Sequence, residues 1–204
     1  MYNRQSSLSV LQGFVSECDS IGSILLVKHE VEINWSQMYK STKEKTKAIG
    51  EVYTVYNKGI EEYWFDRAKF LSQNISNLRH MCKENEVFSV ASLVETKNKQ
   101  YFHFALMNLH PRSGVTLQDL NNYLKYISGD RKGVLVKTDR YFHYIGYYLL
   151  TNKEWLRFLG KILIPFVFVN PGYIGYSLLR GYCCIRLTAA NKVKKVIPYV
   201  IKEV

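Results

Sequence analysis

Three apolar runs between residues 101 and 188 end in polar side chains, and no other feature of the chain constrains its fold as much. The first run, Tyr101–Leu109, is apolar at most successive positions, as is typical of a strand buried on both faces. The second run reaches from Tyr141 to Leu150, and the third includes Phe168 and Val169. Because sites on sheets usually lie at strand ends, we expect the functional side chains there.

Helix signals separate these runs. Thr116 and Thr151 each stand three residues before a carboxylate and open an apolar-periodic segment, which predicts one capped helix through Ile127 and another after Thr151. In the second helix, the residues expected to point inward are Trp155, Leu156, Leu159, Ile162 and Leu163. Further strands are predicted over Val134–Lys137, Phe166–Val169, Tyr182–Thr188 and Val196–Lys202, the last at an edge because it contains Pro198.

From Gln100 onward the predicted order is strand, helix, strand, strand, helix, strand. This order indicates an α+β fold with an RNA-recognition-motif-like βαββαβ core, in which helices cover one face of the sheet. We place this core at residues 86–204 and expect residues 1–85 to form a mixed α/β subdomain that packs against it.

Several elements are predicted before the core sheet. Residues 1–20 predict a short helix with Leu8, Leu11 and Val15 on one face. The other expected elements are a strand over Ser23–Val31, an exposed helix or loop over Trp35–Ala48, a hairpin turn at Asn57–Gly59, a helix over Asp66–Cys82 and a strand over Val87–Glu95.

The charge of the chain is basic and unevenly distributed. The formal net charge is +11, yet residues 1–75 contain nine Lys or Arg and nine Asp or Glu, so residues 76–204 carry all of it. A basic section of this kind indicates a polyanionic partner, DNA or RNA first, although a basic surface can also serve solubility alone. Sixteen tyrosines could stack on bases, or simply fill the core.

The cysteine spacing and the N-terminal sequence bear on compartment. Cys18, Cys82, Cys183 and Cys184 show no metal-binding spacing, which favours reduced thiols and argues against a zinc site. No secretory signal is expected at Met1–Val10, and the longest apolar run, Leu159–Val169, is too short to span a bilayer. We therefore expect an intracellular protein, cytoplasmic or nucleoid-associated, without a membrane partner.

The three runs and the residues around them resemble the motifs of the archaeo-eukaryotic primase superfamily, in its primase-polymerase branch. Phe104–His110 resembles the first motif, a strand that ends in Asp-x-Asp, and Lys137–His143 resembles the second, a turn followed by a strand with a His. Val167–Asn170, together with Ile185–Leu187, resembles the third, which ends in Asp and is followed by an apolar-Leu-Arg-apolar strand. The resemblance covers about half of the chain and implies an RNA-recognition-motif-like catalytic core.

The sequence departs from this pattern at the carboxylates. The resemblance places Asn108, His110 and Asn170 where the family has acidic residues. Polymerase chemistry holds two divalent cations on such carboxylates, and neither a neutral amide nor an imidazole replaces them well for magnesium. We therefore expect no metal, no cofactor and no catalytic residue at these degenerate positions. The alternative is an active nucleotidyltransferase that holds Mg or Mn through His110, Glu95 or Asp139.

The resemblance also implies which residues bind. His143 matches the family's nucleotide-phosphate contact and Arg186 matches the basic position of its last strand. The other candidates for phosphate or base contacts are Arg140, Lys137, Arg112, Arg180, Tyr141 and Tyr173. Structural alternatives stay open: His143 and the tyrosines could be core residues, Arg186 could pair with an internal carboxylate or carbonyl, and Asn108 and Asn170 could form turns at strand ends.

These observations favour a nucleic-acid-binding protein that resembles a primase-polymerase without its carboxylates. We expect it to act as an accessory subunit, with protein partners, in a replication, recombination, defence or mobile-element complex. Besides the active enzyme already named, a second alternative is a structural subunit of a ribonucleoprotein or protein assembly.

Overall fold

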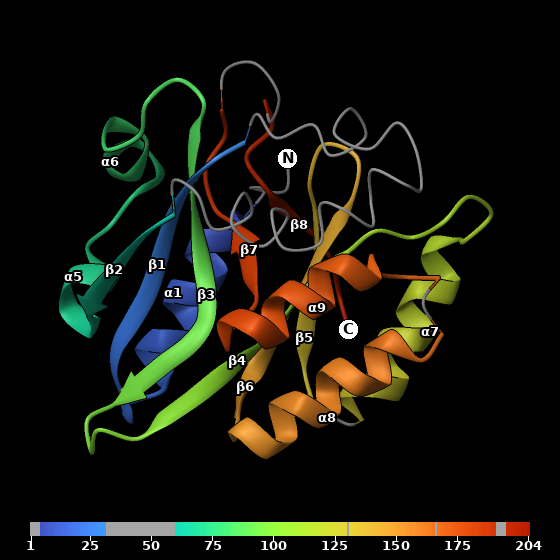
Figure 1. The fold of residues 1–204 in the computed structure, drawn as a ribbon. Helices are drawn as coiled ribbons and strands as arrows, with labels where there is room; N and C mark the ends of the chain where they lie inside the picture. The colour runs from blue at the N-terminus through green and yellow to red at the C-terminus, as the bar shows by residue number, and fades with distance from the viewer. Residues whose placement is uncertain (1–4, 32–59, 130, 166, 191–194) are drawn as a thin grey trace, which may run out of the picture.

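The computed structural model describes residues 5–31, 60–129, 131–165, 167–190 and 195–204. They form the α+β fold that the sequence predicts, with helices on an antiparallel sheet (Figure 1). The described helices are α1 (Ser7–Glu17), α5 (Arg67–Leu71), α6 (Ile75–His80), α7 (Leu117–Ser128), α8 (Asn152–Leu163) and α9 (Pro171–Arg180). The described strands are β1 (Ile21–Glu30), β2 (Glu61–Asp66), β3 (Glu86–Thr96), β4 (Tyr101–Leu109), β5 (Gly133–Lys137), β6 (Phe142–Leu150), β7 (Cys184–Arg186) and β8 (Tyr199–Glu203).

The apolar run over Tyr101–Leu109 is the middle strand of the sheet. The strand order is β2-β1-β3-β4-β6-β5-β8, with each neighbouring pair antiparallel. The central position confirms the prediction, because a strand covered on both faces must be apolar at successive positions. Strand β8, which directly follows Pro198, lies at the edge of the sheet, also as predicted.

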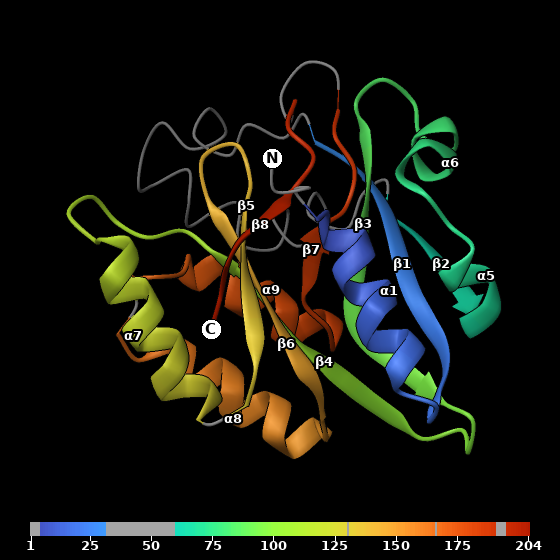
Figure 2. The same cartoon turned by 180° about the vertical axis from the view of Figure 1, so that it is seen from behind.

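Helices cover both faces of the sheet, whereas the sequence predicts helices on one face of the core sheet only. On one face lie α7, α8 and α9, and on the other lies α1 (Figures 1 and 2). Adjacent residues of β4 show the two layers: His103 stacks on Trp155 of α8 at 4.3 Å between ring centroids, and Phe104 meets Phe14 of α1 at 5.8 Å. Successive side chains of a strand point to opposite faces, so β4 contributes to both halves of the core.

Strand β3 links the N-terminal strands to the motif-bearing strands. One edge of β3 pairs with β1 from Glu86 to Thr96. Its other edge pairs with β4 at Leu93–Glu95 and with β7 at Ser89–Ala91, so β7 follows β4 along the same edge. Strands from residues 1–85 and 86–204 therefore share one sheet, and the predicted division between two subdomains stays a prediction.

The local helix signals are confirmed. Leu8, Leu11 and Val15 of α1 are buried, and both predicted capping boxes form. In each box the threonine hydroxyl accepts from the N3 backbone N–H and the N3 carboxylate accepts from the threonine backbone N–H. These bonds satisfy N–H groups that a helix start otherwise leaves without partners.

The helix predicted over Asp66–Cys82 is wrong as one element. It is divided into α5 and α6, because Asn74 adopts an extended backbone and its side chain accepts from the N–H of Asn77 to start a new helix. Met81, at the C-cap of α6, is exposed. In α8, Leu156 and Leu163 are exposed as well, contrary to prediction, while Phe158 is buried with Trp155.

Two predicted strands near the C-terminus also differ from the structure. Val167–Val169 do not form a strand, since Asn170 caps α9 directly afterwards and Pro171 supplies its first residue. The strand predicted over Tyr182–Thr188 is limited to Cys184–Arg186. The expected helix or loop over Trp35–Ala48 and the turn at Asn57–Gly59 lie outside the described residues.

Two further findings concern possible membrane spans and the cysteines. In the ranges described above, no helix is long and apolar enough to cross a bilayer. The four cysteines are free thiols, and burial raises the pKa of Cys183 and raises that of Cys184 to about 12. Thiols with a raised pKa are poor nucleophiles at neutral pH.

Candidate functional site

The turn between β5 and β6 is fixed by its own hydrogen bonds. The backbone N–H of Thr138 donates to the carbonyl of Tyr141 at 3.0 Å, and the N–H of Tyr141 donates to the hydroxyl of Thr138 at 3.1 Å. Arg140 is exposed at the tip of this turn. Lys137, just before it, lies with its ammonium 4.3 Å from the ring centroid of Phe142. The turn therefore presents an exposed cation on a backbone with defined geometry.

Asp139 ties this turn to the C-terminal segment. One oxygen of its carboxylate lies 2.7 Å from Nη2 of Arg186, and the other accepts from the backbone N–H of Val196 at 2.9 Å. Nη1 of Arg186 donates to the carbonyls of Thr188 and Val196 at 2.7 and 2.8 Å. Burial lowers the pKa of the Arg186 guanidinium, and the Asp139 charge opposes that shift. Arg186 is 8% exposed, so its partners are internal, which is the structural alternative that the sequence left open.

The end of β4 lies against the same turn. Asn108 is directly opposite His143 of β6, so both side chains are on one face of the sheet. His143 is buried, with 3% exposure. His110 stacks on Tyr141, with 3.9 Å between ring centroids and 12° between the planes. The first and second motif segments are therefore in direct contact.

The third motif segment also reaches the end of β4. The N–H of His110 donates to the carbonyl of Phe168 at 2.7 Å, and that of Arg112 donates to the carbonyl of Val167 at 2.9 Å. Asn170 follows, and its side-chain oxygen accepts from the N–H of Gly172 at 2.9 Å as the cap of α9. The backbone bonds thus bring all three motif segments to one end of the central strand.

Two predicted site residues belong to α9. Tyr173 is on the buried side of this helix, and its hydroxyl donates to the carbonyl of Cys184 at 2.8 Å. Arg180 is in the last turn of α9, about 15 Å along the helix axis from Asn170 at 1.5 Å per residue. Its guanidinium carbon lies 5.4 Å from the ring centroid of Tyr182. The structure therefore groups Lys137, Arg140, Tyr141, His143, Arg112 and Arg186 around the strand end, whereas the Tyr173 hydroxyl and the Arg180 guanidinium contact Cys184 and Tyr182.

Two features of this site were missed by sequence reasoning. The sequence leaves the internal partner of Arg186 unspecified, and the structure shows that it is Asp139, which is 47 positions away in the chain. The stacking of His110 on Tyr141 was not predicted either. Neither pair has a spacing signal, because both contacts depend on which strands become neighbours.

The donor set does not fit the pair of divalent cations that primase chemistry uses. Among the described residues, no three His, Cys, Asp or Glu side chains form a group that could hold a metal ion. The Asp139 carboxylate is engaged with Arg186 and Val196, and the Asn170 oxygen is engaged with Gly172. Magnesium prefers carboxylate and water oxygens in octahedral geometry.

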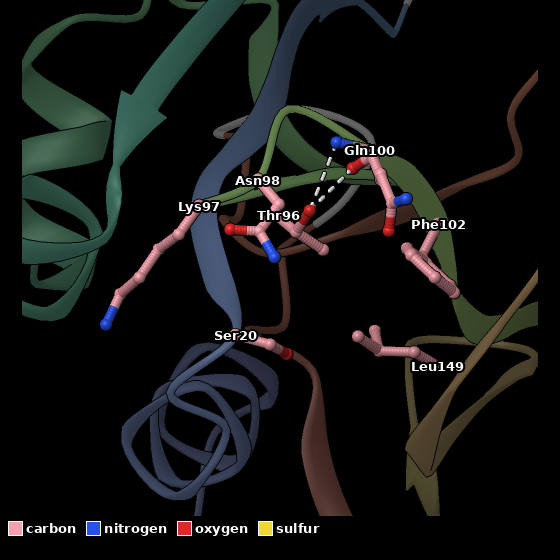
Figure 3. Close-up of a pocket in the computed structure, with 7 residues that line it drawn as sticks. All are labelled: Ser20, Thr96, Lys97, Asn98, Gln100, Phe102 and Leu149. Atoms are coloured by element: carbon pink, nitrogen blue, oxygen red, sulfur yellow. Dashed lines mark hydrogen bonds between the residues drawn. The ribbon is translucent and has the colours of Figure 1, made fainter.

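A separate pocket lies at the opposite end of β4, by the β3–β4 turn (Figure 3). It has a volume of about 360 Å³ and is lined by Ser20, Thr96, Lys97, Asn98, Gln100, Phe102 and Leu149. The Thr96 hydroxyl bonds the backbone N–H and carbonyl of Gln100, which closes the turn, and the Lys97 side chain extends away from the pocket. This pocket shares no residue with the motif segments.

Comparison with known proteins identifies the family. Neither curated proteins nor solved structures include a significant match to this chain. A sequence model of the family described as archaeo-eukaryotic primase 1D-like matches residues 68–199, which is well over half of the chain and includes all three motif segments. The chain therefore belongs to the archaeo-eukaryotic primase-like family.

Proposed function

We propose that this protein binds DNA or RNA without catalysing nucleotide transfer, as an accessory subunit of a replication, recombination, defence or mobile-element complex. Membership of the primase-like family connects the chain with nucleic acids. The observation that carries the proposal is the turn between β5 and β6, which is held by the Thr138 and Asp139 hydrogen bonds and exposes Arg140 of the second motif segment.

The arrangement of cations supports an electrostatic grip on phosphates. Arg140 and Arg112 are exposed, and Lys137 is half-buried on the strand that leads into the turn. Arg186 has a different role in this proposal: it is a positioning residue, because its guanidinium is buried against Asp139 and holds the turn in place. Contacts of this kind provide affinity but little base readout, so we expect weak dependence on sequence and strong dependence on salt.

The residues at the family's carboxylate positions support the non-catalytic part of the proposal. Asn108, His110 and Asn170 offer amide and imidazole groups there, and Asn170 is already used as a helix cap. A measurement of labelled nucleotide incorporation, with Mg or Mn and a range of templates, tests this part. Template-dependent incorporation would contradict it and would favour an active nucleotidyltransferase.

A binding titration tests the interface. The wild-type protein and the Arg112→Ala/Arg140→Ala variant are each titrated into single-stranded and double-stranded DNA and RNA. Each strand is 20 nucleotides long, and the titrations are repeated at several salt concentrations. We expect the double variant to bind about tenfold more weakly at 0.1 M salt, and the slope of log affinity against log salt to fall by roughly 0.7 to 0.9 for each lost phosphate contact.

Matched controls distinguish the contribution of the β5–β6 turn to affinity from that of the overall positive charge. Lys97→Ala removes an exposed cation from the β3–β4 turn at the other end of β4, so it should leave the affinity unchanged within about twofold. Asp139→Asn weakens the hold on the turn without removing a cation, and we expect it to lower affinity while the salt slope stays the same. Equal losses for Lys97→Ala and Arg140→Ala would refute the assignment of the interface to the turn.

A further inference from the structure

The β5–β8 edge of the sheet carries cations beyond those of the motif segments. Strand β8 is the last strand of the sheet and runs along β5 (Figure 2). Lys202 of β8 is exposed and lies opposite Leu135, which is two positions before Lys137 on β5. Residues that lie opposite each other, and residues two positions apart on one strand, share a face of the sheet. Lys202 and Lys137 are therefore on the same face.

Arg131, just before β5, adds a third cation to this face. Its guanidinium carbon lies 4.0 Å from the ring centroid of Tyr148, and its Nε donates to the carbonyl of Ser128 at 3.1 Å. The Tyr148 hydroxyl is 3.4 Å from that of Tyr144, which lies opposite Leu135 and therefore belongs to the same face. Arg131 is thus an exposed cation that two contacts hold in place.

Arg140, exposed at the tip of the β5–β6 turn, continues this line of cations. We call the four side chains the edge row: Arg131, Lys202, Lys137 and Arg140. At about 3.3 Å per residue, the six positions from Arg131 to Lys137 extend over at most about 20 Å. One strand of B-DNA has a phosphate every 3.4 Å along the helix axis, so this length corresponds to about six phosphates.

The cations of the edge row form no ion pairs within the described residues. Glu203 follows Lys202 in the chain but lies opposite Val134, and its side chain is therefore on the other face of the sheet. The pKa of Tyr147 supports this placement, because burial and the charge of Glu203 raise it, and the Tyr147 ring lies 6.2 Å from that of Phe14 on α1. The carboxylate next to Lys202 thus faces away from the row.

Two more carboxylates near the row have other partners. Asp139, adjacent to Arg140, pairs with the guanidinium of Arg186. The Glu154 carboxylate accepts from the N–H and the hydroxyl of Thr151. These hydrogen bonds lower the pKa of Glu154, and the charge of Arg131 adds to that shift. The edge row therefore keeps its positive charge available for an external anion.

We infer that the edge row is a second part of the nucleic-acid interface, and that one phosphate backbone runs from the β5–β6 turn along β5 and β8 over about six nucleotides. The inference rests on the function proposed above and adds the path and the length of the bound strand. The cations follow one strand direction, which matches the regular charge spacing of a phosphate backbone. Arg131 and Lys202 are the binding residues that it adds.

The dependence of affinity on oligonucleotide length tests the inference. Oligonucleotides of 4 and 12 nucleotides, of the strand type that the full-length protein binds best, are titrated by fluorescence anisotropy at several salt concentrations. Arg131→Ala/Lys202→Ala should weaken binding of the 12-mer about tenfold and lower the slope of log affinity against log salt by roughly 1.4 to 1.8, for two lost phosphate contacts. Binding of the 4-mer should weaken less than about threefold, because the turn with Arg112 and Arg140 holds a short strand.

A charge-matched variant is the control. Lys83→Ala/Lys97→Ala also removes two exposed cations, from the loops before and after β3, and should leave the affinity for the 12-mer unchanged within about twofold. Circular dichroism and urea unfolding check that each variant folds. Arg131→Lys/Lys202→Arg keeps both charges and should keep most of the affinity.

The outcomes separate this inference from the proposed function. Equal losses for the row variant and the control, or equal losses for the 4-mer and the 12-mer, would overturn the edge row, even where Arg112→Ala/Arg140→Ala still weakens binding. Binding to phosphatidylglycerol vesicles or to polyglutamate that needs Arg131 and Lys202, with binding of the 12-mer unchanged in their variant, would overturn it as well. Wild-type protein that binds no oligonucleotide would refute the proposed function itself.

Discussion

His103 shows how one buried side chain makes stability depend on pH. It is 3% exposed, its Nδ1 lies 3.1 Å from the hydroxyl of Ser92, and its ring stacks on Trp155. Burial lowers the pKa of His103 to about 4 from an ordinary value of 6.5. Between these two values the unfolded chain binds a proton that the folded chain excludes, so the free energy of unfolding falls as pH decreases from 6.5 to 4.

The size of this effect can be measured with a neutral replacement. This shift in the pKa of His103 corresponds to a decrease in the free energy of unfolding on the order of 3 kcal/mol when pH 4 is reached. We expect urea unfolding at pH 7, 6, 5 and 4 to show a smaller loss for His103→Gln than for wild type, although this variant starts from lower stability. The exposed His80 provides the control, since His80→Gln should follow the wild-type profile. Parallel profiles for all three proteins would disprove the role of His103.

At the scale of one element, α8 depends on its first residues. Thr151 and Glu154 satisfy backbone N–H groups at the start of the helix, which carries Trp155 and Phe158 into the core. Thr151→Ala removes the hydroxyl acceptor and should lower the free energy of unfolding by about 1 kcal/mol. Thr151→Ser keeps the hydroxyl acceptor, so its free energy of unfolding should lie within a few tenths of a kcal/mol of that of wild type in the same urea titration. Equal stability of the Ala and Ser variants would show that the cap contributes little.

At the scale of the whole molecule, the sheet joins the N-terminal strands to the primase-like strands. The complete length of β3 pairs with β1, and the α1 face packs Phe14 against Phe104 of the central strand. We expect the isolated fragment 86–204 to bind a hydrophobic dye and to unfold without a cooperative transition, because the fragment lacks β1 and α1. The loss of both is large compared with the free energy of unfolding of a folded domain, which is only about 5–15 kcal/mol. The full chain should unfold in one transition under the same conditions. A cooperative transition of the fragment would instead establish residues 86–204 as an autonomous domain.

Local sequence patterns determined many of the elements, and the reason is that these elements depend on close neighbours in the chain. The capped starts of α7 and α8 follow from Thr116 and Thr151 with carboxylates three residues later. The continuous apolar character of Tyr101–Leu109 identified the central strand. The order of the motif segments also identified the family, although the binding roles of individual residues stay predictions.

The sequence by itself thus determined the element types, the α+β class and the family, since periodicity, capping and motif order are local properties. Only the tertiary structure decided that Arg186 pairs with Asp139, that His110 stacks on Tyr141, and that Val167–Val169 meet the end of β4 without forming a strand. It also decided that Leu156 and Leu163 are exposed. Their apolar character predicted burial, but which flank of a helix is covered depends on the elements that pack beside it, and no local pattern specifies those neighbours.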